Sequence, residues 1–131
     1  MSQKRRLRLW VPLFLLAVTV VFYLVSGPPE PVDIIVCDAS FIGLETILPA
    51  PLALAAPGAR VITLIKPQFE VGKGQVGKGG VVRDPALHDQ VCTRIRAWLD
   101  NMPDWTVLDV IESPITGPEG NVEFLIAAVH D

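Results

Sequence analysis

Hydrophobic residues follow two different patterns along this chain of 131 residues. Residues 9–25 form one uninterrupted uncharged run, whereas the later hydrophobic runs are short and are separated by Pro, Gly and charged residues. Between the two patterns lies the sequence Ser26-Gly27-Pro28-Pro29-Glu30-Pro31. Proline lacks a backbone donor and restricts the residue before it, so this cluster ends any helix. We therefore expect an N-terminal segment over 1–27, a linker over 28–31 and one small folded domain over 32–131.

The short runs predict the order strand, helix, strand, helix, strand, strand. Two β-branched runs, at 32–37 and 61–65, are typical of buried parallel strands. Residues 44–56 have helical spacing, with prolines that kink or delay the helix and Pro57-Gly58 to end it. A second helix should begin after Asp84 as its N-cap, and its apolar stripe is Leu87, Val91, Ile95, Trp98 and Leu99. Strands at 106–111 and 122–129 follow, so the pattern predicts an α/β layer closed by an antiparallel hairpin.

The first hydrophobic run is long enough to cross a bilayer as a helix. Its 17 residues, Leu9 to Val25, span roughly 25 Å at 1.5 Å per residue. Basic residues at positions 4–8 predict an N-terminus retained inside, and Trp10 and Tyr23 suit the membrane interfaces. A single-pass signal anchor is the leading interpretation, with a cleaved signal peptide and a buried core helix as alternatives. Without insertion, the domain would be cytoplasmic.

The charge of the domain limits the partners it can bind. Of the 11 Lys and Arg residues four precede position 9, which leaves 7 against 14 Asp and Glu and a net charge of about -7. Such a surface disfavours general nucleic-acid binding, which depends on neutralised phosphates. The only concentrated basic patch is formed by Lys66, Lys73, Lys78 and Arg83.

The cysteines and histidines indicate no metal site or disulfide. Cys37 and Cys92 fall in apolar contexts, which is typical of small buried hydrophobes. His88 and His130 have no Cys or His partner at ligand spacing.

Candidate chemistry lies where the predicted strands end. Asp38 and Lys66 directly follow the first two strands, and ligands of parallel sheets bind outside the carboxyl ends of strands. We expect these two side chains to converge, with Glu123 entering from the last strand. The alternative is that each is a solvated strand end.

The glycine-rich loop after Lys66 contains two nucleotide-motif matches that fail in context. Residues 72–77 fit G-x-G-x-x-G but neither follow a strand directly nor open a helix. Residues 72–78 fit G-x-x-x-x-G-K, yet Gly79 stands where a P-loop needs Ser or Thr. A flexible basic lid over a phosphate-rich partner is the better interpretation.

Four segments in the right order and spacing resemble the TlyA (haemolysin A) family of FtsJ-type ribosomal RNA 2′-O-methyltransferases. They are VCDASFI at 36–42, LIKPQFE at 64–70, VGKGGVVRDP at 76–85 and SPITGPEGNVEF at 113–124. The resemblance covers about residues 31–129 and implies a partial Rossmann-like methyltransferase sheet. It also implies methyl transfer from S-adenosylmethionine to a ribose 2′-hydroxyl, in the family on cytidines of ribosomal RNA.

The family's Lys-Asp-Lys-Glu set maps here to Asp38, Lys66 and Glu123. The resemblance gives Lys66 the role of base or orienting group, held by Asp38 and Glu123, with Asp38 also near the cofactor's sulfonium. Lys73, Lys78 and Arg83 would face the RNA.

The sequence departs from the family pattern at its beginning. The family's RNA-binding S4-like domain, first catalytic lysine and glycine-rich cofactor motif have no counterpart here. We therefore expect the C-terminal half of such an enzyme, inactive alone. The alternatives are a membrane-anchored binding remnant that complements a separate N-terminal half, and a small phosphate- or RNA-binding α/β module.

Overall fold

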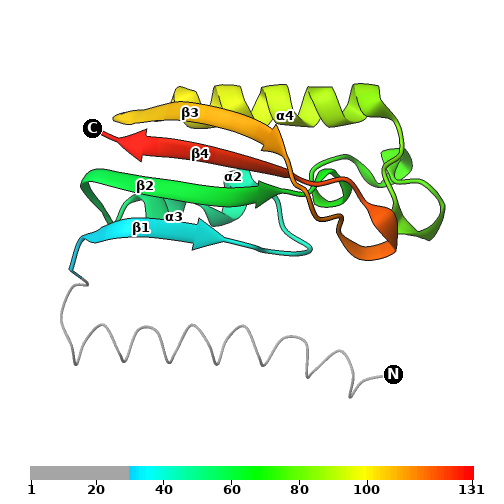
Figure 1. The fold of residues 1–131 in the computed structure, drawn as a ribbon, viewed down its shortest axis with the longest axis horizontal. Coiled ribbons are helices and arrows are strands. Elements are labelled where there is room, and N and C mark those ends of the chain that lie inside the picture. The colour runs from blue at the N-terminus through cyan, green and yellow to red at the C-terminus, as the bar shows by residue number, and fades with distance from the viewer. Residues whose placement is uncertain (1–29) are drawn as a thin grey trace, which may run out of the picture. The chain divides into compact units, whose positions relative to one another are not determined.

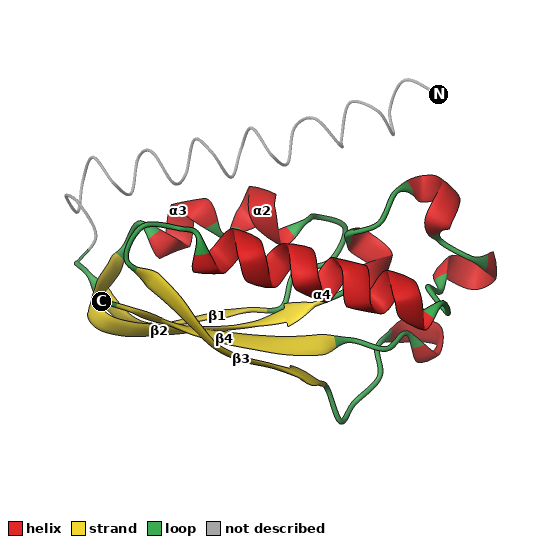
Figure 2. Cartoon of the chain, turned by 90° about the horizontal axis from the view of Figure 1, so that it is seen from above, coloured by secondary structure: helices red, strands yellow, loops and turns green. Residues whose placement is uncertain are grey.

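The computed structural model describes residues 30–131, and these form a four-stranded sheet with helices packed on one face (Figure 1, Figure 2). The strand order is β1-β2-β4-β3. The strands are β1 (Val32–Cys37), β2 (Ala55–Ile65), β3 (Trp105–Glu112) and β4 (Phe124–His130), and the helices are α2 (Leu44–Ile47), α3 (Pro49–Leu52) and α4 (Pro85–Asp100).

The sheet combines a parallel pair with an antiparallel hairpin. β1 is parallel to β2, and the connection between them carries α2 and α3. β4 lies between β2 and β3 and is antiparallel to both. The predicted α/β layer with a closing antiparallel hairpin is therefore confirmed.

The predicted helix over 44–56 is wrong in length. It is divided into two helices of 4 residues each, α2 and α3. Pro49 and Pro51 lack the N–H groups that would continue one helix. β2 then begins at Ala55, six residues before the predicted start, and runs through Pro57-Gly58 rather than being preceded by them. Gly58 has φ +83°, and the β1–β2 register shifts at this point, so a bulge accommodates both residues.

The helix α4 matches the prediction closely. The Asp84 carboxylate accepts a hydrogen bond of 2.9 Å from the Ala86 N–H, and Pro85 occupies the first helical turn. Three members of the predicted stripe, Val91, Ile95 and Leu99, are buried in the core. Leu87 and Trp98 are half-buried, and a position that the stripe omitted, His88, is buried.

The first strand differs from the prediction of a buried strand. β1 lies at one edge of the sheet, where Ile35 is buried but Ile34 and Val36 are 69% and 73% exposed. The reason is that helices cover only one face of the described sheet (Figure 2). Because successive side chains of a strand point to opposite faces, every second side chain of β1 points away from the helices.

The last strand begins at Phe124, so Glu123 lies in the loop just before β4 instead of within it. The predicted membrane-spanning run at 9–25 lies outside the described residues. Within residues 30–131, no helix combines the length and apolar character needed to cross a bilayer.

Candidate functional site

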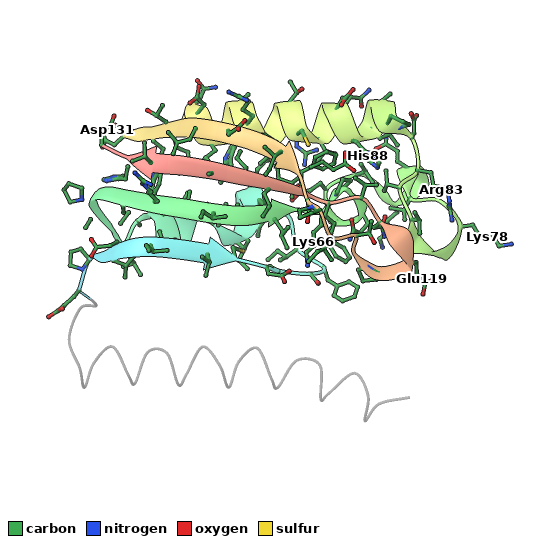
Figure 3. The ribbon with its side chains drawn as sticks, viewed as in Figure 1. Lys66, Lys78, Arg83, His88, Glu119 and Asp131 are labelled. Atoms are coloured by element: carbon green, nitrogen blue, oxygen red, sulfur yellow. The ribbon has the colours of Figure 1, made fainter. Side chains whose placement is uncertain are left out.

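Lys66 is the centre of a polar cluster at the carboxyl ends of the parallel strands (Figure 3). β2 ends at Ile65 and β1 at Cys37, so Lys66 and Asp38 are the first residues beyond their strands. The Lys66 ammonium forms an ion pair with Asp38 and donates a hydrogen bond of 3.3 Å to Ser40 Oγ. Lys66 is only 9% exposed, whereas the Asp38 side chain is 69% exposed. The predicted convergence of Asp38 and Lys66 is confirmed, and their catalytic roles stay predictions.

Glu123 is buried beside this cluster and is held by a residue that sequence reasoning did not single out. The chain turns after Lys66 through a 3-10 helix, Pro67–Phe69, which carries Gln68. Gln68 Nε2 donates a hydrogen bond of 2.8 Å to Glu123 Oε2. Both side chains are buried, which makes this contact strong and directional.

The expected contact of Glu123 with Lys66 is replaced by this hydrogen bond to Gln68. Ile65 pairs with Phe124 in the antiparallel ladder, and continuing that register by one residue sets Lys66 opposite Glu123. Opposite residues of antiparallel strands share a face. The fold thus brings Glu123 to the Lys66 side of the sheet, while Asp38 and Ser40 are the acceptors that Lys66 uses among residues 30–131.

Glu70 anchors the segment that carries Lys66 and Gln68. Its carboxylate accepts a hydrogen bond of 2.8 Å from the Leu44 N–H and pairs with Arg94 of α4 at 2.7 Å. Burial raises the pKa of Glu70 above its ordinary value of 4.5, and the Leu44 N–H and Arg94 oppose that rise. The LIKPQFE segment is therefore fixed at both ends, by Lys66 to β1 and by Glu70 to α2 and α4.

The basic loop extends beyond this segment at the same end of the sheet (Figure 3). It contains two 3-10 turns, Lys73–Gln75 and Lys78–Gly80. Lys73, Lys78 and Arg83 are exposed, and Arg83 Nη1 donates a hydrogen bond of 3.1 Å to the Lys78 carbonyl. These cations form a solvent-facing group apart from the buried Lys66.

Asn121 joins the basic loop to the loop that precedes Glu123. Its side chain accepts from the Val82 N–H at 3.0 Å and donates to the carbonyls of Gly80 and Pro118. The imidazole of His88 contacts the Val82 carbonyl at 2.8 Å. The backbone N–H and carbonyl of Val82 are therefore both bound by side chains, those of Asn121 and His88. The loop is therefore tied down at 80–82, next to the first turn of α4.

Phe41 is an exposed aromatic residue beside the Lys66 cluster that sequence reasoning also missed. It is 89% exposed, and its ring centroid lies 4.8 Å from that of Phe69. Its φ of +64° is unusual for a bulky residue and costs free energy. Residues held in sparsely populated backbone regions are concentrated at functional sites. Phe41 lies in the segment 36–42 that was singled out in the sequence, but its positive φ can be seen only in the structure.

The two cysteines are half-buried rather than fully buried as predicted, and both pack against the hydrophobic core. Burial, together with the nearby Asp89, raises the pKa of Cys92 to about 11, so its thiol is protonated at neutral pH. Across residues 30–131 there is no group of three or more His, Cys, Asp or Glu side chains arranged to hold a metal ion.

Known proteins resemble this chain in sequence and in fold. The family model for FtsJ-like methyltransferases matches residues 5–130. The chain is 46% identical over 95 residues to the "16S/23S rRNA (cytidine-2'-O)-methyltransferase TlyA" of Mycobacterium tuberculosis, covering 72% of this chain and 35% of that protein. It is 37% identical over 93 residues to "Hemolysin A" of Brachyspira hyodysenteriae, covering 71% of this chain and 38% of the relative.

A solved structure shares the fold as well as the sequence. It is "The crystal structure of a putative hemolysin from Lactococcus lactis", with a TM-score of 0.73 and 35% identity, covering 82% of this chain and 51% of that one. The chain spans about a third of the length of the curated relatives it matches. On these matches, the chain belongs to the FtsJ-like methyltransferase family, in its TlyA branch.

Proposed function

We propose that this chain supplies the Asp38–Lys66–Glu123 side of an active site for S-adenosylmethionine-dependent 2′-O-methylation of ribosomal RNA. The observation that carries the proposal is the buried Lys66 ammonium, fixed by Asp38 and Ser40 at the carboxyl end of the parallel pair. A curated relative named as a ribosomal RNA cytidine-2′-O-methyltransferase is 46% identical to this chain over 95 residues, which supports the proposal.

The chemistry requires an orienting group because a ribose hydroxyl is a poor nucleophile. S-adenosylmethionine supplies an electrophilic methyl group on a positively charged sulfonium. Lys66 would hold the 2′-oxygen by hydrogen bonding and stabilise the negative charge that develops on it, as the hydroxyl proton leaves to solvent and the methyl group passes from sulfur to oxygen. Asp38 orients the ammonium. Its carboxylate is exposed and negatively charged, so it suits the positive sulfonium of a neighbouring cofactor.

RNA would be held by two kinds of contact around this site. Lys73, Lys78 and Arg83 neutralise phosphates, which gives affinity without sequence preference. Phe41 offers an exposed ring on which a base can stack, and stacking on aromatic side chains contributes about 1–3 kcal/mol per base. The target nucleotide would then lie with its 2′-hydroxyl at Lys66, next to a base stacked on the Phe41 ring.

The chain alone is expected to bind RNA but not to methylate it. The family's cofactor motif and first catalytic lysine have no counterpart in the sequence, and the described sheet contains only the four strands above. Methyl transfer therefore requires the part of the domain that carries the cofactor motif.

The decisive experiment measures RNA affinity and cofactor affinity separately. Fluorescence anisotropy with a cytidine-containing fragment of bacterial ribosomal RNA should show salt-sensitive binding by the full chain, and Phe41→Ala should weaken it about 5- to 100-fold. Ile115→Ala, which also removes an exposed apolar side chain, is the matched control. Calorimetric titration with S-adenosylmethionine should show no heat of binding. Failure to bind RNA would refute the proposed substrate, and micromolar cofactor affinity would refute the need for a further part of the domain to bind the cofactor.

A further inference from the structure

Ser40 lies in the short loop that joins β1 to α2, beside the Lys66 ammonium. Its Oγ accepts a hydrogen bond of 3.3 Å from Lys66 Nζ, and the residue is exposed. This is the one hydrogen bond that the Ser40 side chain makes within residues 30–131. A serine hydroxyl has one proton to donate and two lone pairs with which to accept. The proton and the second lone pair of Ser40 Oγ are therefore free to bind a substrate or water.

The loop that carries Ser40 is held at both of its ends. Asp38 at its beginning pairs with Lys66. At its other end, the N–H of Leu44, where α2 begins, donates a hydrogen bond of 2.8 Å to the Glu70 carboxylate. The loop therefore holds the hydroxyl next to Lys66 through its own contacts, and such fixed placement is what a catalytic group requires.

Methylation of a ribose hydroxyl releases a proton that another group must accept. The Lys66 ammonium has three donors and no lone pair, so it can hold the 2′-oxygen but cannot take its proton. The Asp38 carboxylate is engaged by that ammonium and, in the proposed function, by the sulfonium. Glu123 is buried and bound to Gln68. Ser40 is the exposed, neutral group of this cluster that has a free lone pair.

We propose that Ser40 is a catalytic residue, which receives the proton of the 2′-hydroxyl and passes its own proton to water. The inference rests on the proposed function and assigns the route by which the proton reaches solvent. The 2′-oxygen supplies the electron pair of the new bond to the methyl carbon, and the pair of the broken bond stays on sulfur. The 2′-hydroxyl proton moves to Ser40 Oγ while the Oγ proton moves to a water molecule. Ser40 ends the step as a neutral hydroxyl, as it began.

A hydroxyl is a weak base, yet it is sufficient for this step. The 2′-oxygen gives an electron pair to the methyl carbon, so its proton becomes strongly acidic as the new bond forms. Ser40 does not have to hold a positive charge, because its own proton leaves as the other arrives. The hydrogen bond that Lys66 donates to Oγ polarises the O–H bond of Ser40 and eases the release of that proton.

The first test measures RNA binding by the full chain without cofactor. The probes are a fluorescein-labelled hexanucleotide of cytidine and its 2′-deoxy counterpart. The wild type should bind the ribose form more tightly, because the 2′-hydroxyl donates a hydrogen bond to Ser40. Ser40→Ala should reduce this preference about 3- to 10-fold, as expected for one hydrogen bond. Ser40→Thr keeps the hydroxyl and should retain the preference.

The second test measures methyl transfer in single turnovers with the cofactor-binding part of the domain present. Ser40→Ala should slow the transfer step about 100-fold, the usual effect of removing a group that accepts a proton. This loss of rate should exceed the loss of RNA affinity, because the proton moves only during the reaction. Ser40→Thr should restore the rate to within about tenfold of the wild type. The wild-type rate in mixtures of light and heavy water should follow a curve, because two protons move together.

Thr46→Ala is the matched control for both tests. It removes an exposed hydroxyl from α2, outside the contacts of Lys66, and should leave the ribose preference and the transfer rate within about twofold of the wild type. Urea unfolding of Ser40→Ala should have the same midpoint as that of the wild type, because the lost hydroxyl is exposed. An altered midpoint would mean that Ser40 acts on the fold and not on the proton.

The outcomes separate the role of Ser40 from the proposed function. Three results would overturn the proton route alone: an undiminished ribose preference in Ser40→Ala, a wild-type transfer rate in Ser40→Ala, and equal effects of Thr46→Ala. A straight line for the wild type in the heavy-water series would do the same, since it would mean that a single proton moves. Failure of the wild type to bind the cytidine hexanucleotide would instead refute the proposed function, and the role of Ser40 with it.

Discussion

The backbone of Gly117 lies against the carboxylate of Glu123 so closely that a β-carbon at position 117 would overlap Oε2. Gly117 has φ -81°, which any residue adopts, so it is the contact that requires glycine and not the backbone conformation. Glu123 is therefore enclosed between Gly117 on one side and the Gln68 amide on the other. Within the segment 113–124, Gly117 therefore leaves the space that the Glu123 carboxylate occupies.

Replacing Gly117 with Ala should force Glu123 out of its place. We expect the free energy of unfolding to fall by about 1–3 kcal/mol, as for other overpacked sites, when measured by urea denaturation. Gly74→Ala is the matched control, because a β-carbon there meets no atom within 4 Å, and it should be neutral or slightly stabilising.

A double-mutant cycle identifies the clash as the cause. In a Glu123→Ala background the carboxylate is absent, so Gly117→Ala should lose most of its cost. An undiminished cost in that background would show that Gly117 is required for a different reason.

Asp38→Asn should separate stability from function. The Asp38 side chain is 69% exposed, so solvent screens its ion pair with Lys66 and the free energy of unfolding should change by less than about 1 kcal/mol. Methyl transfer, measured with the cofactor-binding part of the domain present, should fall at least about 100-fold because the ammonium loses its orienting charge. Equal activity of Asp38→Asn and wild type would remove Asp38 from the mechanism.

The sequence was sufficient to predict elements that local chemistry specifies. α4 was predictable because its cap, Asp84, its proline and its stripe of buried residues act within the helix itself. β1 was predicted with its observed bounds, yet its exposure was not, because burial depends on what covers each face of the sheet. The predicted helix over 44–56 failed because Pro49 and Pro51 divided it and a bulge allowed Pro57 and Gly58 to enter β2.

The site shows the same division between local and tertiary information. The meeting of Asp38 and Lys66 followed from strand ends in a parallel pair. The roles of Gln68, Ser40 and Asn121 depend on contacts between segments far apart in the sequence, such as the 55 positions that separate Gln68 from Glu123. Spacing along the chain carries no signal for such contacts.

Asn121→Ala should release the basic loop. The substitution leaves the Val82 N–H and the carbonyls of Gly80 and Pro118 without their side-chain partner, so the free energy of unfolding should fall by about 1–3 kcal/mol. Trypsin should cleave after Lys78 faster than in the wild type. Asn101→Ala, at the exposed end of α4, is the control and should leave both measurements unchanged. Unaltered cleavage in Asn121→Ala would show that the loop is held by other contacts.

Glu70 should make stability depend on pH in a defined direction. Its pKa is raised in the folded protein above the ordinary 4.5, chiefly by burial, so the folded state binds its proton more tightly than the unfolded state does. The stability it contributes is therefore present below pH 4.5 and is lost as the pH rises through the folded value. Glu70→Gln keeps an acceptor for the Leu44 N–H but cannot ionise. The difference in unfolding free energy between wild type and Glu70→Gln should fall with rising pH in urea titrations, and a rise would contradict the prediction.

Lys73 and Lys78 should contribute to RNA affinity through phosphate contacts alone. For single-stranded RNA, each phosphate that the protein neutralises contributes about −0.7 to the slope of log K against log salt. Lys73→Ala with Lys78→Ala removes two such contacts and should reduce the magnitude of that slope by about 1.4. The loss should be the same for fragments of different sequence, because phosphates carry no sequence information. Arg96→Ala removes an exposed cation from α4, away from the loop, and should preserve the slope. A sequence-dependent loss, or an equal effect of Arg96→Ala, would mean that the loop lysines do not form a local phosphate site, and that the acidic domain binds RNA through Lys66 and Phe41 instead.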